Sequence, residues 1–131
     1  MTCVEKAVEL FERQYNCAQA VLGGFAERLG VDEKTAMLLA SSLGGGIAHT
    51  GEACGAALGM CLAIGAAKGY AAVDDPAVKP AHNARVKAMM EAFRAHFGAM
   101  DCKDLQEVGN RARCTAFVRF AAELVEKELE I

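Results

Sequence analysis

A cysteine opens the stretch Cys54-Gly55-Ala56-Ala57-Leu58-Gly59, which follows the glycine run Gly44-Gly45-Gly46 near the middle of the chain. Small and apolar residues continue without a charge as far as Lys68, and such a segment predicts a buried central helix over about residues 50–69. A cysteine near the start of a helix lies in the partial positive charge of the helix dipole, which favours thiolate over thiol. The stretch therefore predicts both a central helix and a reactive cysteine at Cys54.

Apolar residues at helical spacing recur through the rest of the chain, and no segment alternates with period two. Asn16 and Asp32 are predicted N-caps, and Gly30 and Gly98 are predicted helix ends. These signals predict longer helices at about residues 3–14, 17–29, 33–43, 50–69, 81–97 and 112–130, a short helical turn at about 101–108, and an exposed connection at 70–80. The predicted fold is therefore all-α, a bundle of five or six helices that forms a single domain over residues 1–131.

Composition and charge exclude several classes of protein. With 53% hydrophobic and 24% charged residues in a chain of 131, the protein is globular, and its net charge of -3 provides no basic surface for nucleic acid. The longest apolar run, residues 53–67, is shorter than the roughly 20 residues that cross a bilayer, so no membrane span is predicted. The first residues form an acidic amphipathic helix instead of a signal peptide, which favours a cytoplasmic location.

Six cysteines in a chain of this size, in a reducing compartment, favour catalytic or metal-binding roles over structural disulfides. Cys17, Cys102 and Cys114 also lie near predicted helix starts, where the local field lowers a thiol pKa. Cys61 follows Cys54 by two helical turns on the same face, about 10.5 Å away, beyond the ~7 Å limit for a disulfide. Cys54 therefore needs a partner from another segment, and Cys61 is interpreted as a small hydrophobe.

Small residues recur at every fourth position of the predicted central helix, namely Gly51, Gly55, Gly59, Ala63 and Ala67. Tight packing against another helix explains such a ridge; alternatively, the ridge leaves room for a cofactor or cluster, with Gly55 and Gly59 as cofactor-binding positions. His49, in the glycine-rich loop, is the candidate base or metal ligand. The chain has no Cys-x-x-Cys, zinc-finger spacing, phosphate-binding loop or dinucleotide fingerprint, and those sites are excluded.

Several segments together resemble a known family. They are Tyr15-Asn16-Cys17-Ala18-Gln19-Ala20-Val21, Gly44-Gly45-Gly46, Gly51-Glu52-Ala53-Cys54-Gly55-Ala56-Ala57-Leu58-Gly59, and the later cysteines Cys102 and Cys114. This combination resembles the C-GCAxxG-C-C family, for which redox activity is proposed; the order in this chain is Cys-Gly-Ala-x-x-Gly, whereas the family name has Gly-Cys-Ala. The resemblance spans about residues 4–125 and implies that the family cysteines are Cys17, Cys54, Cys102 and Cys114. Cys3 and Cys61 fall outside the pattern.

The resemblance leaves three kinds of function open. In the first, the four family cysteines are the catalytic thiols of a small redox protein that performs thiol–disulfide or electron-transfer chemistry. Its partner is a redox protein or a small thiol or disulfide substrate. Chain position then favours Cys54 as the attacking thiolate, Cys17 as its resolving partner, and Cys102 with Cys114 as a second pair.

In the second, the same four cysteines hold an iron–sulfur cluster or a metal ion as cofactor. Their spacings of 37, 48 and 12 residues are unlike the common ferredoxin runs. In the third, the chain is a non-catalytic helical interaction module with buried cysteines, which forms a homodimer through its last helix.

Overall fold

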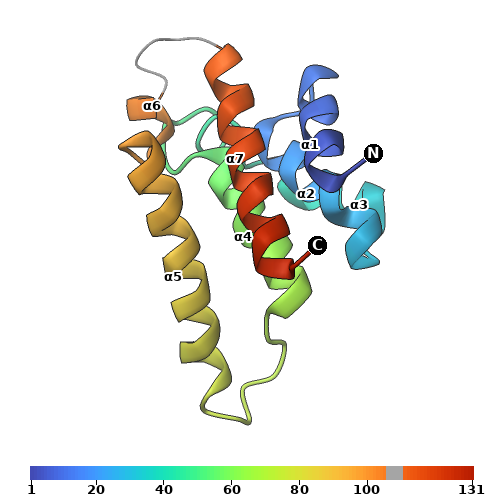
Figure 1. The fold of residues 1–131 in the computed structure, drawn as a ribbon, viewed down its shortest axis with the longest axis vertical. Coiled ribbons are helices and arrows are strands. Elements are labelled where there is room, and N and C mark those ends of the chain that lie inside the picture. The colour runs from blue at the N-terminus through green and yellow to red at the C-terminus, as the bar shows by residue number, and fades with distance from the viewer. Residues whose placement is uncertain (106–110) are drawn as a thin grey trace.

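The computed structural model describes residues 1–105 and 111–131. The described residues form seven helices and no strand, in the order α1 (Cys3–Glu12), α2 (Cys17–Leu29), α3 (Glu33–Ala40), α4 (Gly55–Lys68), α5 (Val78–Phe97), α6 (Cys102–Leu105) and α7 (Arg111–Leu129) (Figure 1). The all-α prediction is confirmed, but the predicted count of five or six helices is too low. One reason is that the backbone N–H groups of Asp104 and Leu105 donate to the Asp101 carbonyl and close α6 as a separate single turn.

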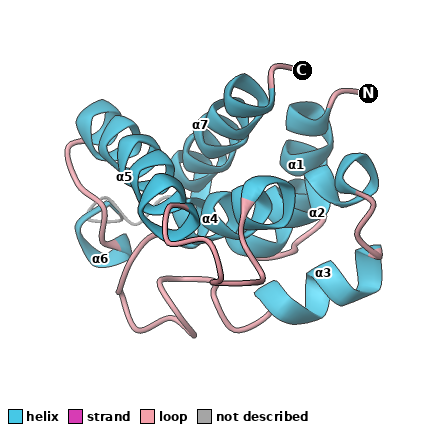
Figure 2. Ribbon diagram, turned by 90° about the horizontal axis from the view of Figure 1, so that it is seen from below, coloured by secondary structure: helices cyan, strands magenta, loops and turns pink. Residues whose placement is uncertain are grey.

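Helices α2 and α4 lie at the centre of the bundle. Helix α2 packs against α1, α3, α4 and α7, while α4 packs against α2, α5 and α7. Figure 2 shows α3 on the outside next to α2, with α5 and α6 on the opposite side of the molecule. The largest fully buried side chains include Phe25, Phe93, Phe117, Met60 and Ile64, which form one continuous core. Among the described helices, none is long and apolar enough to span a membrane.

The helix ends follow the local signals in the sequence. The Asn16 side chain accepts a hydrogen bond from the Gln19 N–H at 2.8 Å, and the Gln19 side chain accepts one from the Asn16 N–H at 3.1 Å, which completes a capping box at the start of α2. Asp32 caps α3 in a similar way through Thr35. Gly30, with φ 70°, and Gly98, with φ 82°, end α2 and α5 in the left-handed conformation. All four predicted caps are therefore confirmed.

Helix α4 begins later than predicted. The sequence places its start at Thr50 or Gly51, whereas the helix begins at Gly55 with Cys54 as its N-cap residue. The residues before Gly55 are held in a different conformation by tertiary contacts. The Cys54 N–H donates to the Met100 carbonyl at 2.9 Å, and Ala53 forms an isolated antiparallel bridge with Asp101. These long-range contacts replace the first helical turn that local sequence favours.

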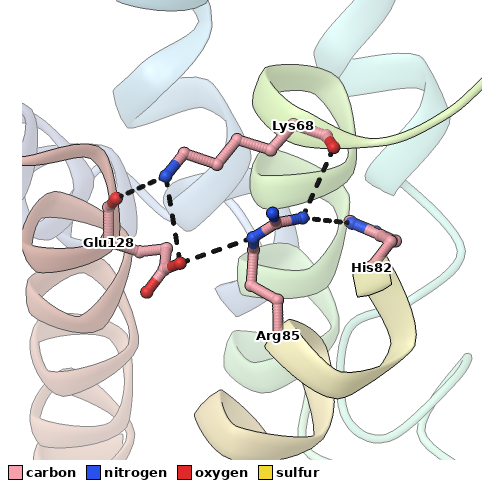
Figure 3. A network of polar contacts seen from close by, with 4 residues as sticks. All are labelled: Lys68, His82, Arg85 and Glu128. Atoms are coloured by element: carbon pink, nitrogen blue, oxygen red, sulfur yellow. Dashed lines mark hydrogen bonds and ion pairs between the residues drawn. The ribbon is translucent and has the colours of Figure 1, made fainter. Parts of the chain in front are cut away.

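A polar network ties α4, α5 and α7 together at the end of α4 opposite Cys54 (Figure 3). The Lys68 ammonium group donates to the Glu128 carbonyl at 2.9 Å, and the Arg85 guanidinium lies 3.4 Å from the Glu128 carboxylate. Arg85 also lies 3.1 Å from Nδ1 of His82, and because a guanidinium can only donate, this histidine nitrogen is the acceptor. These side chains are partly exposed, so the network orients the helix ends more than it stabilises the fold.

The glycine ridge of α4 packs against α2. A Cβ atom built on Gly59 would lie 2.7 Å from the carbonyl oxygen of Ala18 and 3.0 Å from Cβ of Val21. Both neighbours belong to α2, and the nearest is backbone, which cannot move aside as a flexible side chain would. The close approach of these two helices therefore depends on the missing side chain at Gly59.

We expect Gly59→Ala to lower the free energy of unfolding by about 1–3 kcal/mol, because the new methyl group forces α2 and α4 apart. Gly65→Ala is the matched control in the same helix, since nothing lies within 4 Å of the corresponding Cβ position. That variant should be neutral or stabilised by up to about 1 kcal/mol, because alanine favours helix more than glycine does. Urea denaturation measures both values. Equal effects of the two substitutions would contradict the packing argument.

Candidate functional site

The four family cysteines all lie where helices begin. Cys17 is the first residue of α2, Cys54 is the N-cap of α4, and Cys102 is the first residue of α6. Cys114 lies in the first turn of α7. Helices α4, α6 and α7 begin at the same end of the bundle, the upper end in Figure 1. The sequence prediction that these cysteines occupy helix starts is therefore confirmed for each of them.

The fold also brings these cysteines near one another. The thiol of Cys17 lies directly over the backbone of Gly55, the residue that follows Cys54, so that a Cβ atom on Gly55 would collide with the sulfur. The charge of Cys17 acts on the pKa of both Cys54 and Cys102, and the charge of Cys114 acts on that of Cys102. A chain of electrostatic contacts thus links all four residues. Cys17, Cys54 and Cys102 are free thiols.

Backbone hydrogen bonds fix Cys54 beside Cys102. The Cys54 N–H donates to the Met100 carbonyl at 2.9 Å, and the Cys102 N–H donates to the Glu52 carbonyl at 2.7 Å. The two segments therefore run antiparallel for a few residues on each side of the bridge between Ala53 and Asp101. Sequence reasoning missed this pairing, because a single bridge leaves no alternating pattern that would indicate a strand.

The four thiols differ in their exposure to solvent. Cys54 is 3% exposed, Cys102 is 6% exposed and Cys114 is 8% exposed, whereas Cys17 is half-buried. A dissolved disulfide therefore meets Cys17 first. This order differs from the sequence-based expectation, in which Cys54 is the attacking thiol and Cys17 resolves the intermediate.

The electrostatics of Cys54 also oppose the expectation from sequence. Burial raises the pKa of the Cys54 thiol to about 12, and the negative charge of Cys17 contributes to the increase. The backbone N–H groups of Ala57 and Ala56 lower this pKa, but their contacts with the sulfur are too weak to act as a helix cap. The helix start therefore lowers the Cys54 pKa as expected, but loss of water raises it by more, which opposes a thiolate at Cys54. The role of Cys54 as the attacking thiol stays a prediction.

Cys61 and Cys3 lie away from this group. The Cys61 sulfur lies 3.7 Å from the Met90 sulfur, in the contact between α4 and α5, and burial raises its pKa. Cys3 lies on α1, where burial is the main cause of its raised pKa and the charges of Arg28 and Glu126 act on it in opposite directions. Both residues lie apart from the four family cysteines, as the family pattern implies.

Gly55 and Gly59 both face α2, Gly55 at Cys17 and Gly59 at Ala18, so helix packing accounts for the ridge at these positions. Their cofactor-binding role stays a prediction. Within the part of the chain that the structure describes, no group of three or more His, Cys, Asp or Glu side chains is arranged to hold a metal ion.

A left-handed turn precedes α4, where only a glycine-rich loop is predicted from the sequence. Five consecutive residues have positive φ angles: Gly45 (64°), Gly46 (71°), Ile47 (66°), Ala48 (50°) and His49 (61°). Three of these carry a Cβ atom, which costs about 1–2 kcal/mol per residue in this conformation, and the branched Ile47 is an outlier. His49 is exposed in this turn, with its ring over the backbone of Gly45. Its role as base or ligand stays a prediction.

Comparisons with known proteins place this arrangement in a family. No curated protein and no solved structure matches the chain. One family model, described as "Putative redox-active protein (C_GCAxxG_C_C)", matches residues 15–128. The matched region begins just before Cys17 and includes all four grouped cysteines, together with the glycine-rich turn and helices α2 to α7. The chain therefore belongs to the C_GCAxxG_C_C family.

Proposed function

We propose that this protein is a thiol–disulfide redox protein in which Cys17 attacks the substrate and Cys54 resolves the intermediate. The observation that carries the proposal is the position of the Cys17 sulfur, which is half-buried and lies over the backbone next to the buried Cys54. An accessible thiol beside a protected one is the arrangement that two-step disulfide exchange requires. Membership in a redox-active family supports the same chemistry.

The proposed reaction is a two-electron exchange. The Cys17 thiolate attacks a substrate disulfide, forms a mixed disulfide and releases one substrate thiol. The Cys54 thiolate then attacks the Cys17 sulfur, breaks the mixed disulfide and releases the second substrate thiol. The substrate gains two electrons and two protons, and the protein loses them as it forms the Cys17–Cys54 disulfide.

Electrostatic coupling orders the two steps. The negative charge of Cys17 is the second-largest cause of the raised Cys54 pKa, after burial. When Cys17 enters a mixed disulfide it loses that charge, which removes one cause of the raised Cys54 pKa, while burial, the largest cause, remains. The coupling therefore favours the attack by Cys54 after Cys17 has reacted.

Cys102 and Cys114 form the second pair in this proposal. The charges of Cys17 and Cys114 both raise the pKa of Cys102, although burial is the largest cause. Cys102 is thus within electrostatic range of both Cys17 and Cys114, which supports exchange among the three. The Cys102–Cys114 pair would then reduce the Cys17–Cys54 disulfide by a second exchange. Two electrons move from the buried Cys102 and Cys114 to Cys17 and Cys54, and a Cys102–Cys114 disulfide forms.

The test is to titrate the anaerobically reduced protein with an aromatic disulfide, dithiodipyridine, and to map the products by mass spectrometry. One equivalent should release two thiopyridone molecules per chain and produce one disulfide, between Cys17 and Cys54 or, after the second exchange, between Cys102 and Cys114. The metal content of the same reduced sample distinguishes the alternative. Stoichiometric iron or zinc that is lost on replacement of Cys54, or a product without any disulfide among the four cysteines, would contradict the proposal.

A further inference from the structure

The loop that contains the left-handed turn lies next to the four family cysteines. We call residues 43–52 the strap. At its first end, the Leu43 carbonyl and the Gly44 backbone lie with the Cys17 sulfur against Gly55. At its other end, the carbonyls of Gly51 and Glu52 accept hydrogen bonds from the N–H groups of Lys103 and Cys102. The strap thus connects α2 to α6, and in Figure 1 it crosses the bundle at the upper end.

Hydrogen bonds within the strap make it a coherent unit. The His49 N–H donates to the Gly44 carbonyl at 3.0 Å, the Gly51 N–H to the Gly45 carbonyl at 3.2 Å, and the Glu52 N–H to the Gly46 carbonyl at 3.0 Å. The Thr50 hydroxyl donates to the Gly46 carbonyl as well. The hydrogen bonds from Cys102 and Lys103 hold the strap on α6, so opening breaks these bonds and lets the left-handed turn of the strap unwind.

The closed strap is in close contact with Cys102, and its backbone is strained. A Cβ atom on Gly46 would lie 2.5 Å from the Glu52 carbonyl oxygen and 2.8 Å from Cβ of Cys102, so the strap is in close contact with α6 there. Ile47, Ala48 and His49 are held in the left-handed conformation that disfavours residues with a Cβ atom. This strain opposes the closed state and makes opening easier than the hydrogen bonds alone would allow.

We propose that the strap is a gate that controls access to the buried thiols of Cys54 and Cys102. In the closed form these residues are 3% and 6% exposed, so reagents and partner thiols cannot reach them. Opening breaks the hydrogen bond from Cys102 to Glu52 and uncovers both cysteines. The gate rests on the proposed function only for what the access serves, which is reduction of the Cys102–Cys114 disulfide by an external thiol after that pair has reduced the Cys17–Cys54 disulfide.

The test is the rate of alkylation of each cysteine by iodoacetamide under native, reducing conditions, read by peptide mass spectrometry. Gly46→Ala places a methyl group against the Glu52 backbone and should open the gate, so Cys54 and Cys102 should react about tenfold faster. Gly30→Ala is the matched control, since Gly30 has φ 70° against 71° for Gly46 but has nothing within 4 Å of its Cβ position. That control should leave both rates within about twofold.

Cys61 serves as an internal reference in every sample, because it lies in the contact between α4 and α5 and its rate should not change. Ala48→Gly relieves strain without removing a contact, so it should slow alkylation of Cys54 and Cys102 by about threefold. If Gly46→Ala unfolds the protein, Cys61 will also be alkylated faster. In that case the rates in Ala48→Gly test whether the strap controls access to Cys54 and Cys102. Equal rates in Ala48→Gly and the unmodified protein, or equal acceleration by Gly46→Ala and Gly30→Ala, would overturn the gate. Alkylation by iodoacetamide does not depend on disulfide exchange, so these rates test the gate even if the redox proposal fails.

Discussion

Replacement of Cys17 by serine should slow the reaction of the remaining family cysteines with dithiodipyridine at least about a hundredfold, because Cys17 is the partly exposed residue among the four. Cys54 cannot take over this role, since it is buried and burial raises its pKa to about 12. Peptide mass spectrometry of samples quenched at neutral pH measures this rate separately from the reaction of Cys3 and Cys61, which are also partly exposed. The result would assign the attacking thiol by its accessibility, in contrast to the helix-dipole argument.

Cys54→Ser should have a different effect in the same assay. The first thiopyridone is released at the normal rate, and the second is not released, because no thiol resolves the mixed disulfide on Cys17. Mass spectrometry should therefore find one thiopyridyl group trapped on Cys17. Cys61→Ser is the control for loss of a cysteine outside the family set and should leave both steps unchanged. If Cys54→Ser instead abolishes the first step while Cys17→Ser preserves it, the roles are the reverse of those proposed.

The parts of the fold that could be predicted from sequence depend on neighbouring residues. Asn16 binds the backbone of Gln19 only three positions away, and Gly98 ends α5 through its own φ angle. Such signals need no knowledge of the rest of the structure, and the N-caps and helix ends based on them are correct. The grouping of Cys17, Cys54, Cys102 and Cys114 came from the family resemblance, because no local rule relates segments so far apart in the chain.

The errors arise where distant segments meet. The start of α4 is delayed because Cys54 pairs with Met100, and no pattern near Cys54 indicates that partner. The raised pKa of Cys54 could not be predicted from the sequence for the same reason. A helix dipole can be inferred from sequence, whereas desolvation depends on what α2, α6 and α7 place around the sulfur. The left-handed turn is a third case, because Ile47 and His49 adopt positive φ angles that their own preferences oppose.

Burial of Cys54 should make the fold less stable at alkaline pH. The unfolded chain loses the proton of this thiol above about pH 8.5, while the folded protein retains it up to a pKa of about 12. Between those values the folded state binds more protons than the unfolded state, so the free energy of unfolding falls as pH rises. The expected slope from this residue is about 1.4 kcal/mol per pH unit. Its full contribution is present below pH 8.5 and is lost as the pH approaches the folded pKa.

Urea denaturation under reducing conditions measures the free energy of unfolding of the unmodified protein and of Cys54→Ala at each pH. The difference between the two isolates the pH dependence that comes from Cys54. Lysine and tyrosine titrate in both proteins and cancel in the difference. The stability advantage of the unmodified protein should shrink by about 2 kcal/mol between pH 8.5 and 10.5. Cys61→Ala is the matched control: burial alone raises the pKa of that thiol, without a neighbouring cysteine charge, and its slope should end at lower pH. A constant difference between the unmodified protein and Cys54→Ala across this range would mean that the Cys54 thiol ionises in the folded state, and the sequential mechanism would lose its electrostatic basis.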